Sequence, residues 1–239
     1  MASQDPERRR TLHTWSSAGL PWTLQRADNE QHPLLDLASN DYLGLSRHPA
    51  VIDAATTALH RDGVGAGASR LVTGSRPCHA RFEADLADWL GRSCVVLFPS
   101  GFQANLAAVC VLADRHTTVL ADRLIHHSLL VGVRASGARL QRFQHNDLTD
   151  LERRLEALAG QPGSVVVLSE SLFSMEGTSP DVAALAAVCQ RFGADLLMDE
   201  AHALGVLGAE GRGLCFGIEP VRLISGTFGK AFGSGGAFL

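Results

Sequence analysis

The chain has 239 residues, of which 46% are hydrophobic and 19% charged, and its formal net charge is -4. This length and composition are typical of one large globular domain with a sizeable core. The small negative charge argues against nucleic acid as a partner, and no window has the apolar length that a membrane span requires. We therefore expect neither nucleic acid nor a membrane as a partner.

The N-terminus and the cysteines both indicate a reduced, cytoplasmic protein. Arg8, Arg9 and Arg10 have no apolar stretch behind them, so this segment does not have the form of a secretory signal. The five cysteines are far apart, odd in number and without a CxxC pair, which argues against a disulfide framework.

The first third of the chain contains few regular elements. Residues 1–33 are polar and predict an N-terminal arm, with some helix from Pro6 to Ser17. The first expected strand is 34–38, which a turn rich in Ser, Asn, Asp and Gly follows. Next come a helix over 49–60, a glycine-rich connector over 63–70 and an amphipathic helix over 77–90.

From residue 94 onward, apolar runs of strand length alternate with amphipathic helices. Strands are expected at 94–98, 117–121, 138–143, 164–169, 194–198 and 221–224. Helices are expected at 102–113, within 122–135, at 148–159 and at 180–192. This alternation predicts an α/β fold in which a mostly parallel sheet is sandwiched by helices, within one domain over 34–239.

Ligands of such sheets bind beyond the carboxyl ends of the strands, so the polar residues at these ends form the candidate site. Gly101 and Phe102 open a helix directly after a strand, and the N–H groups of a helix N-terminus suit a phosphate. Asp199 leaves an apolar strand directly, and a carboxylate buried there needs a partner.

A lysine in a glycine-rich turn is the centre of this candidate site. Lys230 follows the last apolar strand and has four glycines near it. Partial burial lowers the pKa of an ammonium group toward the neutral amine that attacks carbonyls, so Lys230 is a candidate Schiff-base nucleophile. The alternative is a solvated lysine in a turn.

Taken together, the residues at the strand ends favour pyridoxal 5'-phosphate (PLP). This cofactor requires a Schiff-base lysine, an acid that keeps the pyridine nitrogen protonated, donors to the phenolic oxygen and an anion site. The glycines of 63–67 do not follow a strand as a dinucleotide site requires, and no Ser or Thr follows Lys230 as in a P-loop. The histidines His126, His127 and His202 lack the spacing of metal ligands, so no metal is expected.

From about residue 34 to its end, the sequence also resembles the α-oxoamine synthases, PLP-dependent transferases of fold type I (aspartate-aminotransferase-like). Seven motifs carry the resemblance: SNDYLGL at 39–45, GASRLVTG at 67–74 with His79, SGFQAN at 100–105, FSMEG at 173–177, DEAH at 199–202, GRG at 211–213 and TFGK at 227–230. The first two are most similar to those of family members in biotin biosynthesis.

The resemblance implies a role for each matched residue. Lys230 would form the Schiff base and, once released, act as the base, and Asp199 would pair with the pyridinium nitrogen. His126 would stack on the cofactor ring as the second catalytic residue. The other cofactor-binding residues that the resemblance implies are Ser174 and His202 at the phenolic oxygen, and Gly101, Phe102 and Thr227 at the phosphate.

The implied reaction is the decarboxylative condensation of L-alanine with a pimeloyl thioester, of CoA or a carrier protein, to 8-amino-7-oxononanoate. The resemblance also implies a homodimer. Two alternatives stay open: a sister acyltransferase that uses glycine or serine with another acyl-CoA, and a truncated, non-catalytic relative that only binds PLP or dimerises.

The sequence departs from the family in two places. Family members carry an arginine in the N-terminal arm that helps bind the acyl substrate, whereas this chain has Pro21 there, with Arg26 as the alternative. The chain ends at Leu239, where relatives continue into a C-terminal small domain. We therefore expect a large domain with a near-complete cofactor site and an incomplete substrate site.

Overall fold

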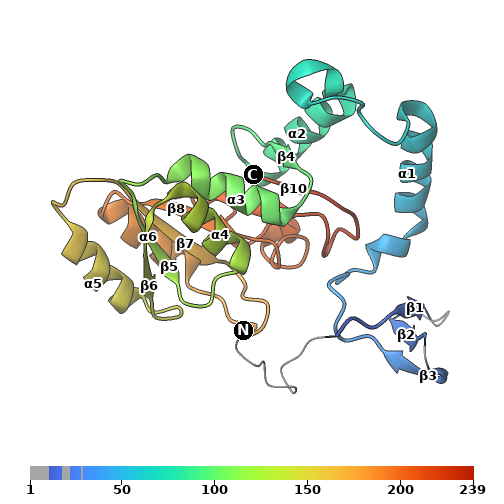
Figure 1. Ribbon diagram of the computed structural model, residues 1–239, viewed down its shortest axis with the longest axis horizontal. Helices are drawn as coiled ribbons and strands as arrows, with labels where there is room; N and C mark the ends of the chain where they lie inside the picture. Colours follow the sequence, from blue (N-terminus) through green and yellow to red (C-terminus); the bar gives the residue numbers. More distant parts are fainter. Residues whose placement is uncertain (1–10, 18–21, 28) are drawn as a thin grey trace, which may run out of the picture. The chain divides into compact units, whose positions relative to one another are not determined.

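The structure is a computed structural model that describes residues 11–17, 22–27 and 29–239 (Figure 1). Its contacts divide the chain into two units, Met1–Asn40 and Asp41–Leu239. The first unit contains a three-stranded antiparallel sheet of β1 (Trp15–Ser17), β2 (Thr23–Arg26) and β3 (Asn29–Leu35). The boundary predicted between residues 33 and 34 falls inside β3, and it stays a prediction.

This small sheet corrects two expectations about the N-terminal arm. Residues 15–17 were expected to end a helix but form β1, because their backbone pairs across a hairpin with 24–26. Residues 6–10 of the expected helix, like Pro21, lie outside the described residues. The strand expected over 34–38 ends at Leu35. The Asp36 side chain accepts the backbone N–H groups of Ala38 and Ser39 and so forms a turn.

The second unit is built on a seven-stranded sheet in the order β4-β10-β9-β8-β7-β5-β6. The five strands from β9 to β6 in this order are parallel, and β10 is antiparallel to both of its neighbours. The strands are β4 (Leu97–Phe98), β5 (Thr118–Asp122), β6 (Arg139–Phe143), β7 (Val165–Glu170), β8 (Asp195–Asp199), β9 (Val221–Thr227) and β10 (Ala237–Phe238). The prediction of a mostly parallel sheet is confirmed, although β4 is shorter than expected.

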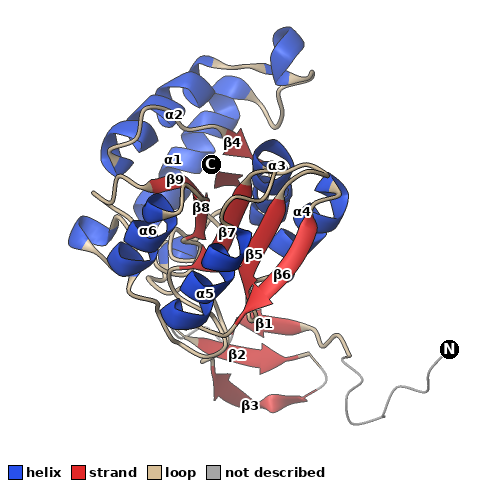
Figure 2. Ribbon diagram, turned by 90° about the vertical axis from the view of Figure 1, so that its left-hand side faces the viewer, coloured by secondary structure: helices blue, strands red, loops and turns tan. Residues whose placement is uncertain are grey.

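Helices cover both faces of this sheet, as the alternating pattern predicted. Figure 2 shows α3 and α4 on one side of the sheet and α5 and α6 on the other. The helices are α1 (Pro49–Asp62), α2 (Pro77–Leu90), α3 (Gly101–Leu112), α4 (His127–Ser136), α5 (Leu148–Leu158) and α6 (Val182–Arg191). Within the described ranges, none of these helices is both long enough and apolar enough to span a membrane.

Successive side chains of the central strands enter two different cores. On β8, Leu196 and Met198 pack into the core that α5 and α6 cover, whereas Leu197 packs into the core that α3 and α4 cover. On β7, Val167 and Leu168 divide between the two cores in the same way. All five side chains are fully buried, which explains why these strands are continuous apolar runs in the sequence.

The strand register aligns three polar residues at the carboxyl edge of the sheet. Glu170 on β7 pairs with Asp199 on β8, and Asp199 pairs with Ser225 on β9. All three are buried. The fold therefore concentrates polar groups at the place where the sequence predicted a site.

Gly226 on β9 offers a test of the packing behind this edge. A Cβ at this position would lie 2.3 Å from the Phe238 ring and 2.6 Å from the Leu204 side chain. We expect Gly226→Ala to lower the free energy of unfolding by about 1–3 kcal/mol, because the core must shift to admit a methyl group. Urea denaturation measures this change.

The matched control is Gly65→Ala, since a Cβ at Gly65 would meet no atom within 4 Å. This variant is expected to stay within about 0.5 kcal/mol of the parent chain. Equal stabilities for the two variants would contradict the packing described for β9.

Candidate active site

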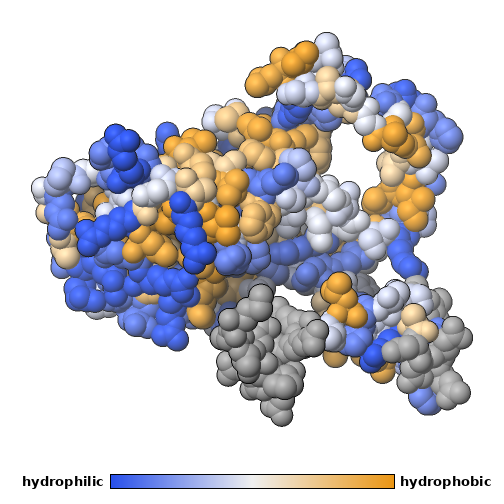
Figure 3. All heavy atoms as spheres, in the orientation of Figure 1, coloured by the Kyte–Doolittle hydropathy of each residue, from blue (hydrophilic) through white to orange (hydrophobic). Residues whose placement is uncertain are grey.

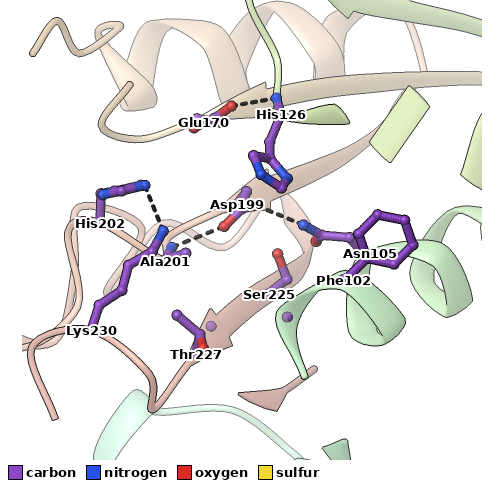
Figure 4. A pocket seen from close by; sticks show the side chains of 12 residues that line it. Phe102, Asn105, His126, Glu170, Asp199, Ala201, His202, Ser225, Thr227 and Lys230 are labelled. Atoms are coloured by element: carbon purple, nitrogen blue, oxygen red, sulfur yellow. Dashed lines mark hydrogen bonds between the residues drawn. The ribbon is translucent and has the colours of Figure 1, made fainter. Parts of the chain in front are cut away.

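A cavity opens at the carboxyl edge of the sheet, where twelve residues line it (Figure 4). Seven of them are residues that the sequence analysis assigned to the site: Gly101, Phe102, His126, Asp199, His202, Thr227 and Lys230. Five were not assigned: Asn105, Glu170, Ala201, Ser225 and Gly226. The structure thus brings together residues that are up to 129 positions apart in the chain.

The structure does not bring Ser174 into this cavity. Ser174 lies in the loop after β7 and is exposed, together with Met175 and Glu176 beside it. Its assignment to a cofactor stays a prediction. The histidine expected to be a bystander, His127, is the first residue of α4 and does not line the cavity.

Asp199, the last residue of β8, is only 6% exposed. Its Oδ2 accepts a hydrogen bond of 2.7 Å from Asn105 Nδ2, and its Oδ1 accepts one of 2.9 Å from the Ala201 N–H. Two donors therefore offset part of the cost of burying this carboxylate at the edge of the sheet.

Asn105 on α3 connects Asp199 to the start of α4. Its Nδ2 also donates to Ser128 Oγ at 2.9 Å, and Ser128 Oγ lies 2.7 Å from His126 Nδ1. In the sequence, Asn105 was recognised only as part of the motif at 100–105, without a role. A signal was present, because Asn105 is four residues after Gly101 and so lies on the same face of α3 as the helix N-terminus.

Lys230 lies in the turn that follows β9, and its Nζ is 2.5 Å from His202 Nε2. Burial lowers the pKa of Lys230, while Asp199, and Glu170 when it is ionised, act in the opposite direction. The amine is therefore easier to deprotonate than that of a solvated lysine, as the Schiff-base interpretation requires.

The other ring nitrogen of His202 forms a hydrogen bond with Tyr42, the only tyrosine in the chain. Burial and the charge of Lys230 lower the pKa of His202 to about 4, so the ring is neutral at pH 7. When Lys230 is protonated, Nε2 accepts from it, so that Nδ1 carries the proton and donates to the Tyr42 hydroxyl at 2.7 Å. Tyr42 was predicted only as part of a turn.

Glu170 is a second buried carboxyl group in the cavity, with 4% of its surface exposed. Its Oε1 accepts the backbone N–H of His126 at 2.6 Å. Burial, with the charge of Asp199 as a smaller cause, raises the pKa of Glu170 to about 8. At neutral pH Glu170 is therefore mostly protonated.

The N-terminus of α3 supplies backbone donors to the cavity. Ser100 caps this helix, and its Oγ accepts the N–H of Gln103 at 3.3 Å. The N–H groups of Gly101 and Phe102 have no partner inside the helix, as is general for a first turn. They are therefore suited to bind an anion.

Thr227 shapes the lysine turn with its hydroxyl group. Its Oγ1 accepts the N–H of Gly229 at 3.2 Å and donates to the carbonyl of Gly236 at 3.1 Å. The hydroxyl hydrogen is thus already engaged in the turn, and a phosphate contact from Oγ1 requires it to reorient.

The chain matches the family described as aminotransferase class I and II over residues 32–239. It belongs to this family and, within it, to the α-oxoamine synthases. The chain is 48% identical over 211 residues to the 8-amino-7-oxononanoate synthase of Acidithiobacillus ferrooxidans. The aligned residues cover 87% of this chain and 54% of the relative. For the enzyme of that name from Chromohalobacter salexigens the identity is 45%, covering 91% of this chain and 57% of the relative. The chain therefore spans about half the length of these curated relatives.

Solved structures agree with this assignment. Serine palmitoyltransferase from Sphingomonas wittichii is 29% identical, with a TM-score of 0.88 over 98% of this chain and 58% of that one. A serine palmitoyltransferase solved with PLP is 30% identical, with a TM-score of 0.87 over 95% of this chain and 57% of that one. The predicted fold type is confirmed.

The raised pKa of Glu170 generates a prediction about stability. Between pH 5 and 8 the folded chain holds a proton that the unfolded chain has lost, so stability falls as the pH rises through this window. One proton contributes a slope of at most about 1.4 kcal/mol per pH unit. We expect Glu170→Gln to remove this contribution, as measured by urea denaturation at several pH values in this window.

The other titrating groups are common to both proteins, so the difference between the two pH profiles reports Glu170 together with its effect on the pKa of Lys230. His202 contributes in the opposite direction below pH 6.5 in both, since its pKa is lowered on folding. The control Glu219→Gln changes an exposed carboxyl group and should reproduce the parent profile. Parallel profiles for the Glu170 variant and the parent would mean that Glu170 is not the protonated group.

Proposed function

We propose that this chain carries the cofactor site of a PLP-dependent acyltransferase that condenses L-alanine with a pimeloyl thioester to 8-amino-7-oxononanoate in biotin biosynthesis. The single observation that carries the proposal is the cavity in which Lys230, Asp199 and His126 meet. The relatives named 8-amino-7-oxononanoate synthase, at 45–48% identity, support the choice of substrates.

The residues of the cavity fit PLP. Asp199 offers a carboxylate to a pyridine nitrogen, Lys230 offers an amine of lowered pKa to an aldehyde, and the first turn of α3 offers N–H groups to a phosphate. Two buried atoms of the lining, Asn105 Oδ1 and Ser225 Oγ, have no hydrogen-bond partner within the described chain. A polar ligand in the cavity is what such atoms require.

When bound, PLP supplies an electron sink for the bond that breaks at the α-carbon of the amino acid. Lys230 is the residue that we propose to take up and return the α-proton, because its lowered pKa increases the share of neutral amine. His202 holds the Lys230 Nζ in place, at 2.5 Å. Asp199 keeps its orientation through the Asn105 and Ala201 donors.

His126 and Ser174 complete the proposed set. His126 lines the cavity, and we propose that its ring stacks on the cofactor. Ser174 is proposed as a donor to the phenolic oxygen beside His202, which requires the loop after β7 to approach the cavity more closely than in this structure.

A second copy of the chain is the proposed partner. Helix α1 buries none of its residues, although Ile52 and Leu59 are apolar and about half exposed. Figure 3 shows such apolar residues on the exposed surface of α1. Helices of this kind gain most of their stability from packing an apolar face, so a homodimer that covers α1 is expected.

A sister reaction with serine or glycine is the rival proposal. Serine palmitoyltransferases resemble the fold at 29–30% identity, whereas the curated relatives named for the alanine reaction reach 45–48%. This difference favours L-alanine. The non-catalytic alternative rests on the length of the chain alone, which is about half that of these relatives.

The test offers pimeloyl-CoA, or a pimeloyl carrier protein, with each of L-alanine, glycine and L-serine to the chain loaded with PLP. Mass spectrometry quantifies the amino-ketone product, and light scattering on the same samples measures the mass of the assembly. We expect a dimer that prefers L-alanine by roughly 10-fold or more, the discrimination that one small group supplies in a fitted pocket.

Three outcomes separate the hypotheses. A preference for glycine or serine would replace the alanine assignment with the sister reaction. PLP binding without any product would leave the non-catalytic alternative. A chain that neither binds PLP nor forms product would contradict the proposal as a whole.

A further inference from the structure

His126 precedes α4 as its N-cap, and its ring nitrogen Nδ1 faces two groups of Ser128. The Ser128 N–H donates to Nδ1 at 3.3 Å, and Ser128 Oγ lies 2.7 Å from the same atom. A backbone N–H is only a donor, so Nδ1 must be an acceptor and carry no proton. This is the arrangement by which an N-cap side chain satisfies the first turn of a helix.

The hydrogen-bond chain from Asp199 supplies a donor for the same arrangement. The Asp199 carboxylate already accepts the Ala201 N–H and faces the Asn105 amide at 2.7 Å. A carboxylate only accepts, so the amide must turn its Nδ2 toward Asp199, and the second Nδ2 hydrogen reaches Ser128 Oγ at 2.9 Å. Because Ser128 Oγ accepts this bond, its own hydrogen is available to His126 Nδ1.

We propose that Asn105 and Ser128 are positioning residues that hold the neutral His126 ring in the tautomer with its proton on Nε2. The direction of every hydrogen bond from Asp199 to His126 is then determined. Ser128 is fully buried and Asn105 is 3% exposed, so water is excluded from the bond between these two side chains, whereas His126 itself is exposed. The backbone of His126 is held from the other side, since its N–H donates to Glu170.

The consequence for the cavity rests on the proposed function, in which His126 lies against the cofactor ring. The bound molecules meet an N–H donor at Nε2 of His126 and not an acceptor. Ser128, which does not line the cavity, would in this way determine the chemistry that His126 presents there. The sequence analysis gave no role to either positioning residue.

The test is long-range proton–nitrogen NMR correlation on the whole chain with ¹⁵N-labelled histidine, without PLP, at a pH where the His126 ring is neutral. Loss of one set of signals in His126→Gln assigns the ring. We expect an unprotonated Nδ1 and a protonated Nε2 in the parent chain. Ser128→Ala should move the Nδ1 signal toward the protonated position, because only the longer backbone contact of 3.3 Å then favours an unprotonated Nδ1.

Ser128→Asp gives the sharper result, because a carboxylate at this position only accepts and should shift the proton to Nδ1. An acidic residue in the first turn suits the helix dipole of α4. The matched control is Ser136→Ala, which removes a hydroxyl of the same helix that bonds only locally, to the Val133 carbonyl at 2.9 Å and the Ala138 N–H at 3.3 Å. This control should leave the His126 signals unchanged.

A proton on Nδ1 in the parent chain would overturn the inference, whether or not the variants fold. So would Ser128→Ala and Ser128→Asp spectra identical to that of the parent chain. The result is independent of the proposed function, since it is read without cofactor. If the chain shows the expected tautomer but binds no PLP, this inference stands and the proposed function is contradicted. If the chain binds PLP but has the proton on Nδ1, the proposed function stands and this inference is contradicted.

Discussion

A buried carboxylate at the end of a central strand determines how the cavity is built. Asp199 needs donors at the edge of the sheet, and it obtains them from α3, through Asn105, and from the backbone of Ala201. The strand register places Glu170 beside it, and two charged carboxylates in one buried site would repel each other. The raised pKa of Glu170 keeps that group mostly protonated at neutral pH and so removes this repulsion.

Lys230 is the only lysine in the chain, and it lies opposite the Asp199 carboxylate. The same burial that raises the pKa of Glu170 lowers that of Lys230 and of His202. The cavity therefore contains a carboxylate, a protonated acid, a neutral imidazole and an amine that gives up its proton readily. Such differences between neighbouring titratable groups are what acid–base chemistry at neutral pH requires.

The central sheet was predictable because both of its faces are buried, which makes each strand a continuous apolar run. The N-terminal hairpin was not, because the pairing of 15–17 with 24–26 depends on contacts between strands and leaves little trace in the local pattern. The strand-end residues of the site were found because parallel strands end at one edge.

The residues that were missed depend on register or on a helix face. Glu170 lies in the cavity because the strand register pairs it with Asp199, and Asn105 lies there because it is one turn of α3 after Gly101. Tyr42 reaches the site through a hydrogen bond to His202, which is 160 residues away in the sequence. Ser174 shows the converse, since its motif is present but Ser174 itself is exposed. Motifs thus predicted which residues line the cavity, whereas the hydrogen-bond partners of these residues required the fold.

The central claim is that this cavity binds PLP through Lys230. The most direct measurement is borohydride reduction of the PLP-loaded chain, followed by peptide mass mapping, with Lys230→Ala as the control. The account predicts a stable pyridoxyl group on the peptide that contains Lys230 and none on the control, since no other lysine can carry it. An unmodified Lys230 in the loaded chain, or an equal yield of modification in the control, would contradict the account.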